Sequence, residues 1–557
     1  MSRSVTTEFT LVHTADVVAA QIPGRELVVH GDRRYTYAEI AERSRRLAAY
    51  LHAQGLGCHR ERDELAGHEV GQDLVGIYAH NGPEFVEGIV GALRARVAPF
   101  NVNYRYVRDE LRHLIGDSGA TALIYHAAFA PRLAEVLPEL PHLRVLVQIA
   151  DGSGNALLDG AVDYETALAA ADPEALPVEP TPDDLYVLYT GGTTGMPKGV
   201  LWRQHDLFVA ACGGRDMNTG AVVESYDIIA ERVAANPGLK LMILPPLIHG
   251  AAQWAALTAL SSGQTVVFPP TVERIDADEV VRTIERERVA VVTLVGDAMA
   301  RPLLAAIESG IADVSSLVAI GNGGAVLSPA LKERLLAAKP GLVIIDGVGS
   351  SEGGAQMSQV SAAGAPSTGT FTAGPHTRVV AEDLGSVLEP GHEGIGWLAQ
   401  RGYAPLGYKG DAAKTAATFP VIDGTRFSLP GDRARHLAGG GIELLGRDSM
   451  TINTGGEKVF AEEVEIALGS HPAVADVIVV GRPSERWGQE VVAVVALADG
   501  ASATPEELTA HGGQSLARYK LPKAVVFRPS LTRSPAGKPD YRWAREQATL
   551  PHGDAAV

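Results

Sequence analysis

The sequence predicts an α/β protein with a large N-terminal body of layered, mostly parallel sheets and a small α+β C-terminal domain. Short β-branched runs alternate with longer helical patterns from about residue 35 to 345, and such alternation is typical of parallel sheets covered by helices. Glycine then punctuates short strands after about residue 370. A last stretch of roughly a hundred residues has the size of a compact domain.

The expected strands of the body are short and apolar. They are 74–78, 121–125, 145–149, 185–189, 240–244, 265–268, 291–294, 317–321 and 342–346. The expected helices are 37–53, 83–96, 278–288 and 328–338. The last of these has Ser328 as N-cap and Pro329 at its first position, and both choices favour a helix start.

After residue 370, glycines such as Gly385, Gly396 and Gly407 predict a twisted antiparallel sheet or small barrel. The C-terminal part is expected to hold helix 461–468, strands 477–480 and 491–497, a helix near 505–517 and strand 524–527. Glu462, Glu463 and Glu465 are expected on the outward face of the first helix. We place the domain boundary between residues 446 and 447, which gives domains 1–446 and 447–557.

Composition excludes several classes of protein. The 557 residues are 46% apolar and carry a formal net charge of −18, which is unfavourable for binding nucleic acid. Two cysteines, Cys58 and Cys212, cannot form a disulfide framework and fit a reducing cytosol. The N-terminus lacks the order of a signal peptide, and no apolar run is long enough to span a membrane. We therefore expect a cytoplasmic protein that binds neither membranes nor nucleic acid.

The polar segment 58–73 is expected to be an exposed loop. His59 and His68 lie in it beside acidic residues, but their spacing is not that of a metal site.

A Gly/Thr-rich segment after the strand at Leu185 predicts a phosphate-binding loop. Its glycines let backbone N–H groups face an anion, its threonines supply hydroxyl donors, and Lys198 supplies positive charge. The binding residues expected here are Thr190, Gly191, Gly192, Thr193, Thr194 and Lys198. A P-loop NTPase is excluded, because Met196 and Pro197 separate the last glycine from the lysine and Gly199 follows it.

The segment Tyr189–Val200 resembles the phosphate-binding signature of the ANL adenylate-forming enzymes, which include acyl-CoA synthetases, luciferases and stand-alone adenylation domains. The resemblance covers essentially the whole chain. It implies the ANL fold, with a mobile C-terminal domain, and the formation of an acyl-CoA thioester through an acyl-AMP intermediate. It also implies ATP, Mg²⁺ and coenzyme A as cofactors or substrates, and a small carboxylic acid as partner; a homodimer is one candidate assembly.

Three segments of the body carry further residues that the resemblance implies. His249 would border the acyl pocket, and Gly323, Gly324 and Ala325 would flank the adenine. In 347–352, Val348, Gly349, Ser350 and Ser351 would bind nucleotide. Glu352 would hold Mg²⁺ together with Thr190, since carboxylate and hydroxyl oxygens suit this ion. Val348 stands where the family usually has an aromatic residue that stacks on adenine, and base stacking is worth roughly 1–3 kcal/mol.

The rest of the implied site lies near the domain boundary and in the C-terminal domain. Asp432 and Arg447 would bind the ribose, although Pro430 replaces the family's threonine before the Gly-Asp pair. The hinge would be Asp448 and Ser449, and Gly455 and Gly456 would admit pantetheine. Lys538 would be the adenylation lysine, and the catalytic set would be Lys538, Thr190, Glu352 and His249.

The likeness is greatest to actinobacterial ligases that act on bulky polycyclic acids, such as steroid side-chain and diterpenoid acids. Small residues near the expected pocket, among them Gly250, Ala251 and Ala252, would leave room for a wide ligand. Alternatives stay open: a fatty-acid CoA ligase, an enzyme that performs only the thioesterification step, an enzyme that loads a carrier protein, and a binding protein without activity.

Overall fold

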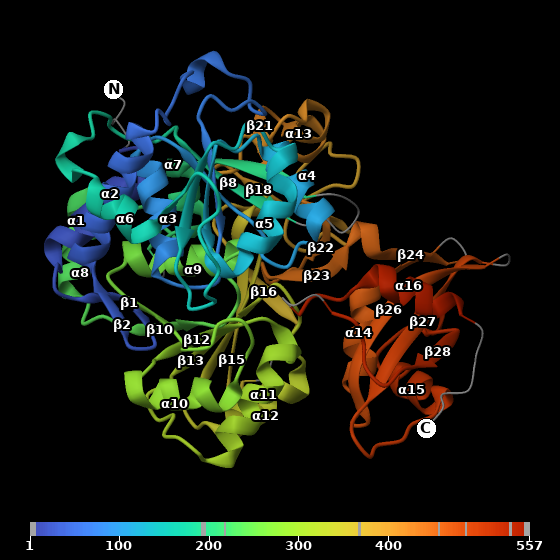
Figure 1. Cartoon of the computed structure of the whole chain (residues 1–557). Helices are drawn as coiled ribbons and strands as arrows, with labels where there is room; N and C mark the ends of the chain where they lie inside the picture. Colours follow the sequence, from blue (N-terminus) through green and yellow to red (C-terminus); the bar gives the residue numbers. More distant parts are fainter. Residues whose placement is uncertain are drawn as a thin grey trace.

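The computed structural model describes residues 7–190, 197–216, 219–365, 369–454, 457–484, 487–533 and 537–550. Figure 1 shows a large body and, beside it, a smaller C-terminal unit coloured orange to red. None of the helices in the described residues is long and apolar enough to cross a membrane.

The largest sheet has 15 strands in the order β2-β1-β11-β10-β12-β13-β14-β15-β16-β23-β22-β18-β21-β20, with β17 paired to β18. Its first part is parallel from β1 to β14. The strands of this part and its edge are β1 (Glu26–His30), β2 (Arg33–Thr36), β10 (Lys240–Ile243), β11 (Thr265–Phe268), β12 (Val291–Leu294), β13 (Ala319–Gly323) and β14 (Val343–Ser350).

The second part of this sheet is antiparallel and contains the glycine-rich strands predicted after residue 370. Its strands are β15 (Gly354–Ala362), β16 (Thr370–Ala373), β17 (Thr377–Val380), β18 (Gly396–Arg401), β20 (Val421–Ile422), β21 (Thr425–Ser428), β22 (Asp432–His436) and β23 (Ile442–Arg447). They continue the parallel sheet through the β14–β15 pair.

A second sheet of eight strands has the order β19-β9-β8-β4-β3-β5-β6-β7. It is parallel except at β8–β9 and β9–β19. Its strands are β3 (Leu74–Tyr78), β4 (Ala98–Asn101), β5 (Ala122–His126), β6 (Val145–Ile149), β7 (Ala161–Asp163), β8 (Leu185–Thr190), β9 (Lys198–Arg203) and β19 (Gly407–Tyr408).

Helices cover both sheets. Those that surround the second sheet and reach the first are α1 (Leu11–Gln21), α2 (Tyr37–Ala53), α3 (Pro83–Arg94), α4 (Arg108–Ser118), α5 (Ala130–Val136), α6 (Tyr164–Ala170), α7 (Gln204–Ala211), α8 (Tyr226–Ala235) and α9 (Gly250–Ser261). One core contains residues of both sheets, for example Val28 and Val266 of the first and Ile77 of the second. Helix α13 (Ala412–Thr418) follows β19.

A second core lies between the parallel strands and helices α10 (Ala277–Glu287), α11 (Gly296–Ser309) and α12 (Pro329–Ala338), at the bottom of Figure 1. Each of the three helices contributes buried side chains to this core, for example Val281, Leu303 and Leu335. The strands contribute Val292 and Ile344. Apolar residues at helical spacing therefore bury one face of each helix on the sheet.

The C-terminal unit is a five-stranded sheet in the order β25-β24-β27-β26, with β28 paired to β27. Its strands are β24 (Thr451–Thr454), β25 (Glu457–Phe460), β26 (Val474–Ser484), β27 (Gly488–Leu497) and β28 (Ala524–Phe527), and its helices are α14 (Ala461–Gly469), α15 (Pro505–Gly512) and α16 (Tyr541–Thr549). The last strand of the large sheet along the chain, β23, runs to Arg447, so the domain boundary predicted at 446/447 falls one residue before the end of this strand.

The α/β class and the alternation of strands and helices are confirmed, and the bounds of β3, β6, β11, β12, β28 and α2 agree with the prediction. One boundary differs in a way that matters for the site. The prediction ended a strand at Asp346, whereas β14 continues to Ser350 because it pairs antiparallel with β15 as far as Ser350 and Gly354. Residues 347–350 thus lie on a strand and not in a loop after it.

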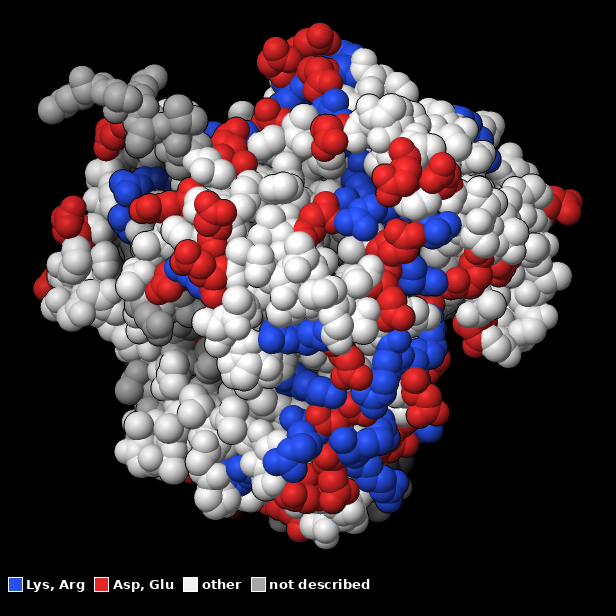
Figure 2. Space-filling model, turned by 90° about the vertical axis from the view of Figure 1, so that its left-hand side faces the viewer, with Lys and Arg blue, Asp and Glu red and all other residues white. Residues whose placement is uncertain are grey.

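The segment 58–73 is less open than expected. It contains a short 3-10 turn, Arg62–Glu64, and ends in the buried residues Gln72 and Asp73. Figure 2 shows that basic and acidic side chains lie interleaved on one face of the molecule, without a broad positive surface there.

Candidate functional site

The phosphate loop connects two antiparallel strands. Thr190 at the end of β8 faces Lys198 at the start of β9, in the last pair of these two antiparallel strands. The predicted residues Gly191, Gly192, Thr193 and Thr194 lie outside the described residues. The Lys198 ammonium forms an ion pair with Asp411, the N-cap of α13, which holds it beside the start of α13.

The segment predicted to flank adenine begins at Gly323, the last residue of β13, and continues into the turn after it. Asn322 fixes it: its amide nitrogen donates to the Ala325 carbonyl (3.1 Å), and its amide oxygen accepts from Gly296 N–H (2.8 Å). Gly324 has φ +83°, a conformation that favours glycine. Gly323 forms the last pair of β13 with Gly347 of β14.

The end of β14 carries the next predicted residues. Val348 packs against a small apolar cluster that includes Met357 and Val379. Gly349 faces the backbone of Gly354 so closely that a Cβ would lie 2.4 Å from its carbonyl oxygen. The hydroxyl of Ser350 is buried and has no hydrogen-bond partner among the described residues. A buried hydroxyl without a partner fits a polar group of a ligand.

Ser351 and Glu352 form a turn after β14. The Ser351 carbonyl accepts a hydrogen bond from the Trp202 indole (2.9 Å). The Glu352 carboxylate accepts one from the Tyr408 hydroxyl (2.7 Å), and burial together with this carboxylate raises the pKa of Tyr408. The ammonium of Lys414 lies 4.3 Å from the centre of the Tyr408 ring.

Asp432 and Arg447 lie opposite each other on β22 and β23. The Arg447 Nε is 3.3 Å from the Asp432 carboxylate. Burial raises the pKa of Asp432, and the positive charges of Arg447 and Lys538 oppose that shift.

Lys538 reaches the body from the C-terminal unit. A Cβ on Gly324 would lie 3.9 Å from its Cε, and a Cβ on the neighbouring Gly537 would lie 3.1 Å from the Val295 carbonyl. Although part of the Lys538 side chain is exposed, the protein around its ammonium and the charge of Arg447 lower its pKa. The carboxylates of Glu352 and Asp432 act in the opposite direction. The ammonium therefore lies in the field of both predicted ligand-binding carboxylates.

His249 is the N-cap residue of α9. Burial lowers its pKa to about 3, and the positive charges of Lys538 and Arg105 act in the same direction. The ring is therefore neutral at pH 7 and lies within electrostatic range of Lys538.

Two glutamates of α14 do not have the orientation predicted for them. Glu462 faces the Asp432–Arg447 pair, and burial raises its pKa to about 7. The Glu465 carboxylate accepts from Val479 N–H (2.8 Å), and burial raises its pKa to about 8. The helix pattern predicted an outward face for both, but the body and β26 cover them.

The structure thus brings His249, Gly324, Glu352, Asp432, Arg447 and Lys538 to one region where the C-terminal unit meets the body. Lys198 faces Thr190 across the β8–β9 pair. Its charge acts on Lys414, which also lies in the field of Glu352. Gly455 and Gly456 lie outside the described residues, and their role in admitting pantetheine stays a prediction. Sequence reasoning missed Tyr408, Asp411 and Glu462. A Gly-Tyr pair before a helix N-cap is too common a pattern to have revealed the first two.

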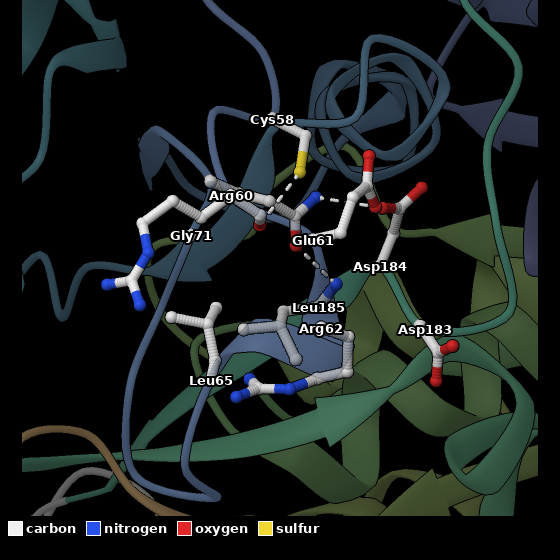
Figure 3. A pocket seen from close by; sticks show the side chains of 10 residues that line it. Cys58, Arg60, Glu61, Arg62, Leu65, Gly71, Asp183, Asp184 and Leu185 are labelled. Carbon is white, nitrogen blue, oxygen red and sulfur yellow. Dashed lines mark hydrogen bonds between the residues drawn. The ribbon is translucent and has the colours of Figure 1, made fainter.

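A small cavity elsewhere does not belong to this region. Figure 3 shows it beside the segment 58–73, where Cys58, Glu61, Leu65 and Asp184 are among the residues that line it. Cys58 donates to the Arg60 carbonyl (3.2 Å), and burial raises the pKa of its thiol, which disfavours a reactive thiolate. The His59 ring lies 2.6 Å from the Asp73 carboxylate. Within the described residues, no group of three His, Cys, Asp or Glu side chains is placed to hold a metal ion.

Comparisons with known proteins match both parts of the chain. The AMP-binding enzyme family matches residues 15–407, and the AMP-binding enzyme C-terminal domain matches residues 463–538. A medium-chain acyl-CoA ligase, Mig, of Mycobacterium avium is 70% identical over 98% of this chain and 99% of that protein. A medium/long-chain-fatty-acid–CoA/3-oxocholest-4-en-26-oate–CoA ligase of Mycobacterium tuberculosis is 43% identical over 94% of each chain.

The fold is similar to that of the anthranilate CoA ligase AuaEII, solved with anthranoyl-AMP. The TM-score is 0.78 at 20% identity, over 97% of each chain.

Proposed function

We propose that this chain acts on a medium-chain carboxylic acid through an acyl-AMP intermediate. The chain belongs to the AMP-binding enzyme family and is an AMP-forming acyl-CoA synthetase. One observation carries the site assignment. Lys538 of the C-terminal unit lies beside Gly324 of the body, in the field of Glu352 and Asp432. A catalytic lysine for adenylation has to meet the nucleotide site in this way.

The first step joins the acid to AMP. A carboxylate oxygen attacks the α-phosphorus of ATP, a P–O bond forms, and the bond to pyrophosphate breaks. Negative charge grows on the α-phosphate oxygens, and the compact Lys538 ammonium is suited to stabilise it. Thr190 and the loop after it would hold the phosphates. The Asp432 carboxylate would accept hydrogen bonds from the ribose hydroxyls.

Mg²⁺ would be held by Glu352, in the turn after β14, and by Thr190, at the end of β8. The Glu352 carboxylate and the Thr190 hydroxyl are oxygen ligands, and Mg²⁺ in phosphate sites is usually held by one or two carboxylates plus substrate oxygens. When bound, the ion supplies positive charge that offsets the phosphate charge.

The second step transfers the acyl group to the CoA thiol. Its sulfur attacks the acyl carbon, and AMP leaves with the electron pair of the C–O bond. We propose that the C-terminal domain, residues 447–557, pivots at Asp448 and Ser449 to withdraw Lys538 and to bring Gly455 and Gly456 to the pantetheine. Burial lowers the pKa of His249 to about 3, so its ring is neutral. A neutral ring beside the acyl path can rotate without moving a charge between different surroundings.

The acid is assigned from the relatives and from the packing near His249. The relative at 70% identity is named for medium-chain acids, and this favours the fatty-acid alternative over a polycyclic substrate. The small residue Gly250 also has a packing explanation, since a Cβ there would lie 2.6 Å from Leu188 Cδ2. Its size therefore does not by itself indicate a wide pocket.

A polycyclic acid is the second candidate. The relative at 43% identity carries both a fatty-acid and a steroid side-chain acid in its name. The two substrate classes share a carboxylate on an apolar body, so one pocket could accept both.

The test is a panel of fatty acids of increasing length, a 3-oxo-steroid side-chain acid and a diterpenoid acid. Each is incubated with the protein, ATP, Mg²⁺ and CoA, and acyl-CoA and AMP are measured. Highest kcat/KM on medium-chain acids supports the proposal, whereas a preference for the steroid or diterpenoid acid contradicts the substrate assignment. Exchange of labelled pyrophosphate into ATP separates a full ligase from an enzyme that only thioesterifies. Rapid product formation with free CoA argues against a carrier-protein loader.

A further inference from the structure

A buried asparagine connects the two loops on which the proposed function depends. Asn101 is the last residue of β4 and is only 4% exposed. Its amide nitrogen donates to the carbonyls of Tyr189 (2.8 Å) and Ile248 (2.7 Å), and its amide oxygen accepts from Tyr189 N–H (2.9 Å). Tyr189 directly precedes Thr190, and Ile248 directly precedes His249.

The contact to Tyr189 takes over where the sheet ends. Strands β4 and β8 pair at Phe100 and Val187. Beyond this pair, the side chain of Asn101 makes the hydrogen bonds to Tyr189 that a paired backbone would make. It satisfies both the N–H and the C=O of Tyr189, as a neighbouring strand would. The Tyr189 ring is held as well, by a hydrogen bond from its hydroxyl to Asp117 (2.7 Å) and by the Phe100 ring at 5.3 Å.

The contact to Ile248 ties the same amide to the segment before α9. Both N–H bonds of the Asn101 amide are used, so no smaller or charged side chain can reproduce the set. A second buried asparagine, Asn81, holds this segment further back: it donates to the Pro245 carbonyl (3.0 Å) and accepts from Leu247 N–H (2.6 Å). Among the described residues, Asn81 makes no hydrogen bond to β8, which makes it a matched comparison.

We propose that Asn101 is a positioning residue that fixes the phosphate loop at Thr190 and the acyl-pocket loop at His249 relative to each other. The inference rests on the proposed function. The acid and the α-phosphate must meet at bonding distance, and a misplacement of about 1 Å can lower a rate by about 10²-fold. One rigid amide bonded to both backbones sets this spacing.

The test compares Asn101→Asp, Asn101→Ser and Asn81→Asp with the unaltered full chain. Asn101→Asp removes both donors and places a carboxylate against two carbonyls. Asn101→Ser keeps one donor and is the milder variant if the first does not fold. Pyrophosphate exchange gives kcat and the KM values for ATP and for acid, and melting temperature reports folding.

The expected result for Asn101→Asp is a loss of about 10²-fold in the kcat of acyl-AMP formation, with the KM for ATP and for acid both changed. Asn81→Asp is expected to change the KM for acid and to leave the KM for ATP as it was. In a double-mutant cycle, Asn101→Ser and Thr190→Val should be non-additive, as should Asn101→Ser and His249→Ala.

Two results would overturn the inference. One is a lower melting temperature of the Asn101 variants with an unchanged kcat and KM of the folded protein. The other is the same kinetic pattern in Asn81→Asp. If the unaltered chain forms no acyl-AMP from any acid, the proposed function fails and the inference fails with it. If the unaltered chain is active and both Asn101→Ser and Asn101→Asp keep that activity, only the inference about Asn101 fails.

Discussion

Asp432 and Arg447 form a cross-strand pair at the edge of the body, with the Arg447 Nε 3.3 Å from the Asp432 carboxylate. Fifteen residues separate them in the sequence, and the antiparallel register of β22 and β23 brings them together. The charges of Lys538 and Glu462, both of which come from the C-terminal unit, act on this pair. The proposed ribose site is therefore also the place where the two parts of the chain meet electrostatically.

Removing the Asp432 charge should weaken nucleotide binding. A hydrogen bond to a charged group contributes about 1.5–3 kcal/mol, so Asp432→Asn is expected to raise the KM for ATP and the Kd for AMP by about 10-fold to 100-fold. Calorimetry with AMP gives the binding constant directly. Glu443→Gln is the control, because Glu443 pairs with Arg435 across the same two strands (2.8 Å) but lies outside the site. Equal effects of both substitutions would contradict the ribose role.

Lys538 should matter for one half-reaction only. Lys538→Ala is expected to lower the rate of pyrophosphate exchange by about 10²-fold to 10³-fold, the range seen when one group that stabilises developing charge is removed. Thioesterification of a supplied acyl-AMP should stay within a few-fold of the unaltered chain, about what small shifts in domain packing can cause. The exposed Lys523 of the same domain gives the control, Lys523→Ala. Loss of both half-reactions in Lys538→Ala would show that its role is not confined to adenylation.

Glu462 should make stability depend on pH. Burial raises its pKa from 4.5 to about 7, and Asp432 acts in the same direction while Arg447 opposes it. The folded protein then binds more protons than the unfolded chain between these two values, so this contribution to stability is present below pH 4.5 and is lost as pH rises through about 7. Glu462→Gln should therefore raise the melting temperature at pH 8 relative to the unaltered chain and do so less at pH 5.

The exposed Glu506 of α15 supplies the control for this experiment. Glu506→Gln should give the same shift, or none, at both pH values. A Glu462→Gln variant that melts at unchanged temperature at pH 8 would mean that the carboxyl is not held in the buried position that faces the Asp432–Arg447 pair.

Gly250→Ala should destabilise the protein through overpacking. The new Cβ would lie 2.6 Å from Leu188 Cδ2, and forcing an extra carbon into a packed core typically costs about 1–3 kcal/mol. Thermal or urea unfolding measures the loss. Gly439→Ala is the matched control, since nothing lies within 4 Å of a Cβ there. Should Gly250→Ala unfold like the unaltered chain while the acid preference changes, the glycine would serve the pocket and not the packing.

Local patterns in the sequence determined the fold class and most of the buried strands. Apolar runs such as Leu74–Tyr78 and Thr265–Phe268 have the predicted bounds because a strand buried on both faces carries its own signal, independent of its neighbours. The phosphate-loop segment was also recognisable, since the Gly/Thr pattern and the following lysine are contiguous. The family followed from such contiguous segments, and the comparisons agree.

The tertiary structure alone decided which distant residues meet. Strand β14 extends to Ser350 because β15 lies beside it, and Glu462 turns inward because the body covers that face of α14. The bonds of Asn101 to Tyr189 and Ile248 join segments that are 88 and 147 residues away in the chain. Burial and pairing across such separations depend on the packing of whole sheets and domains, and no local pattern of residue types encodes them.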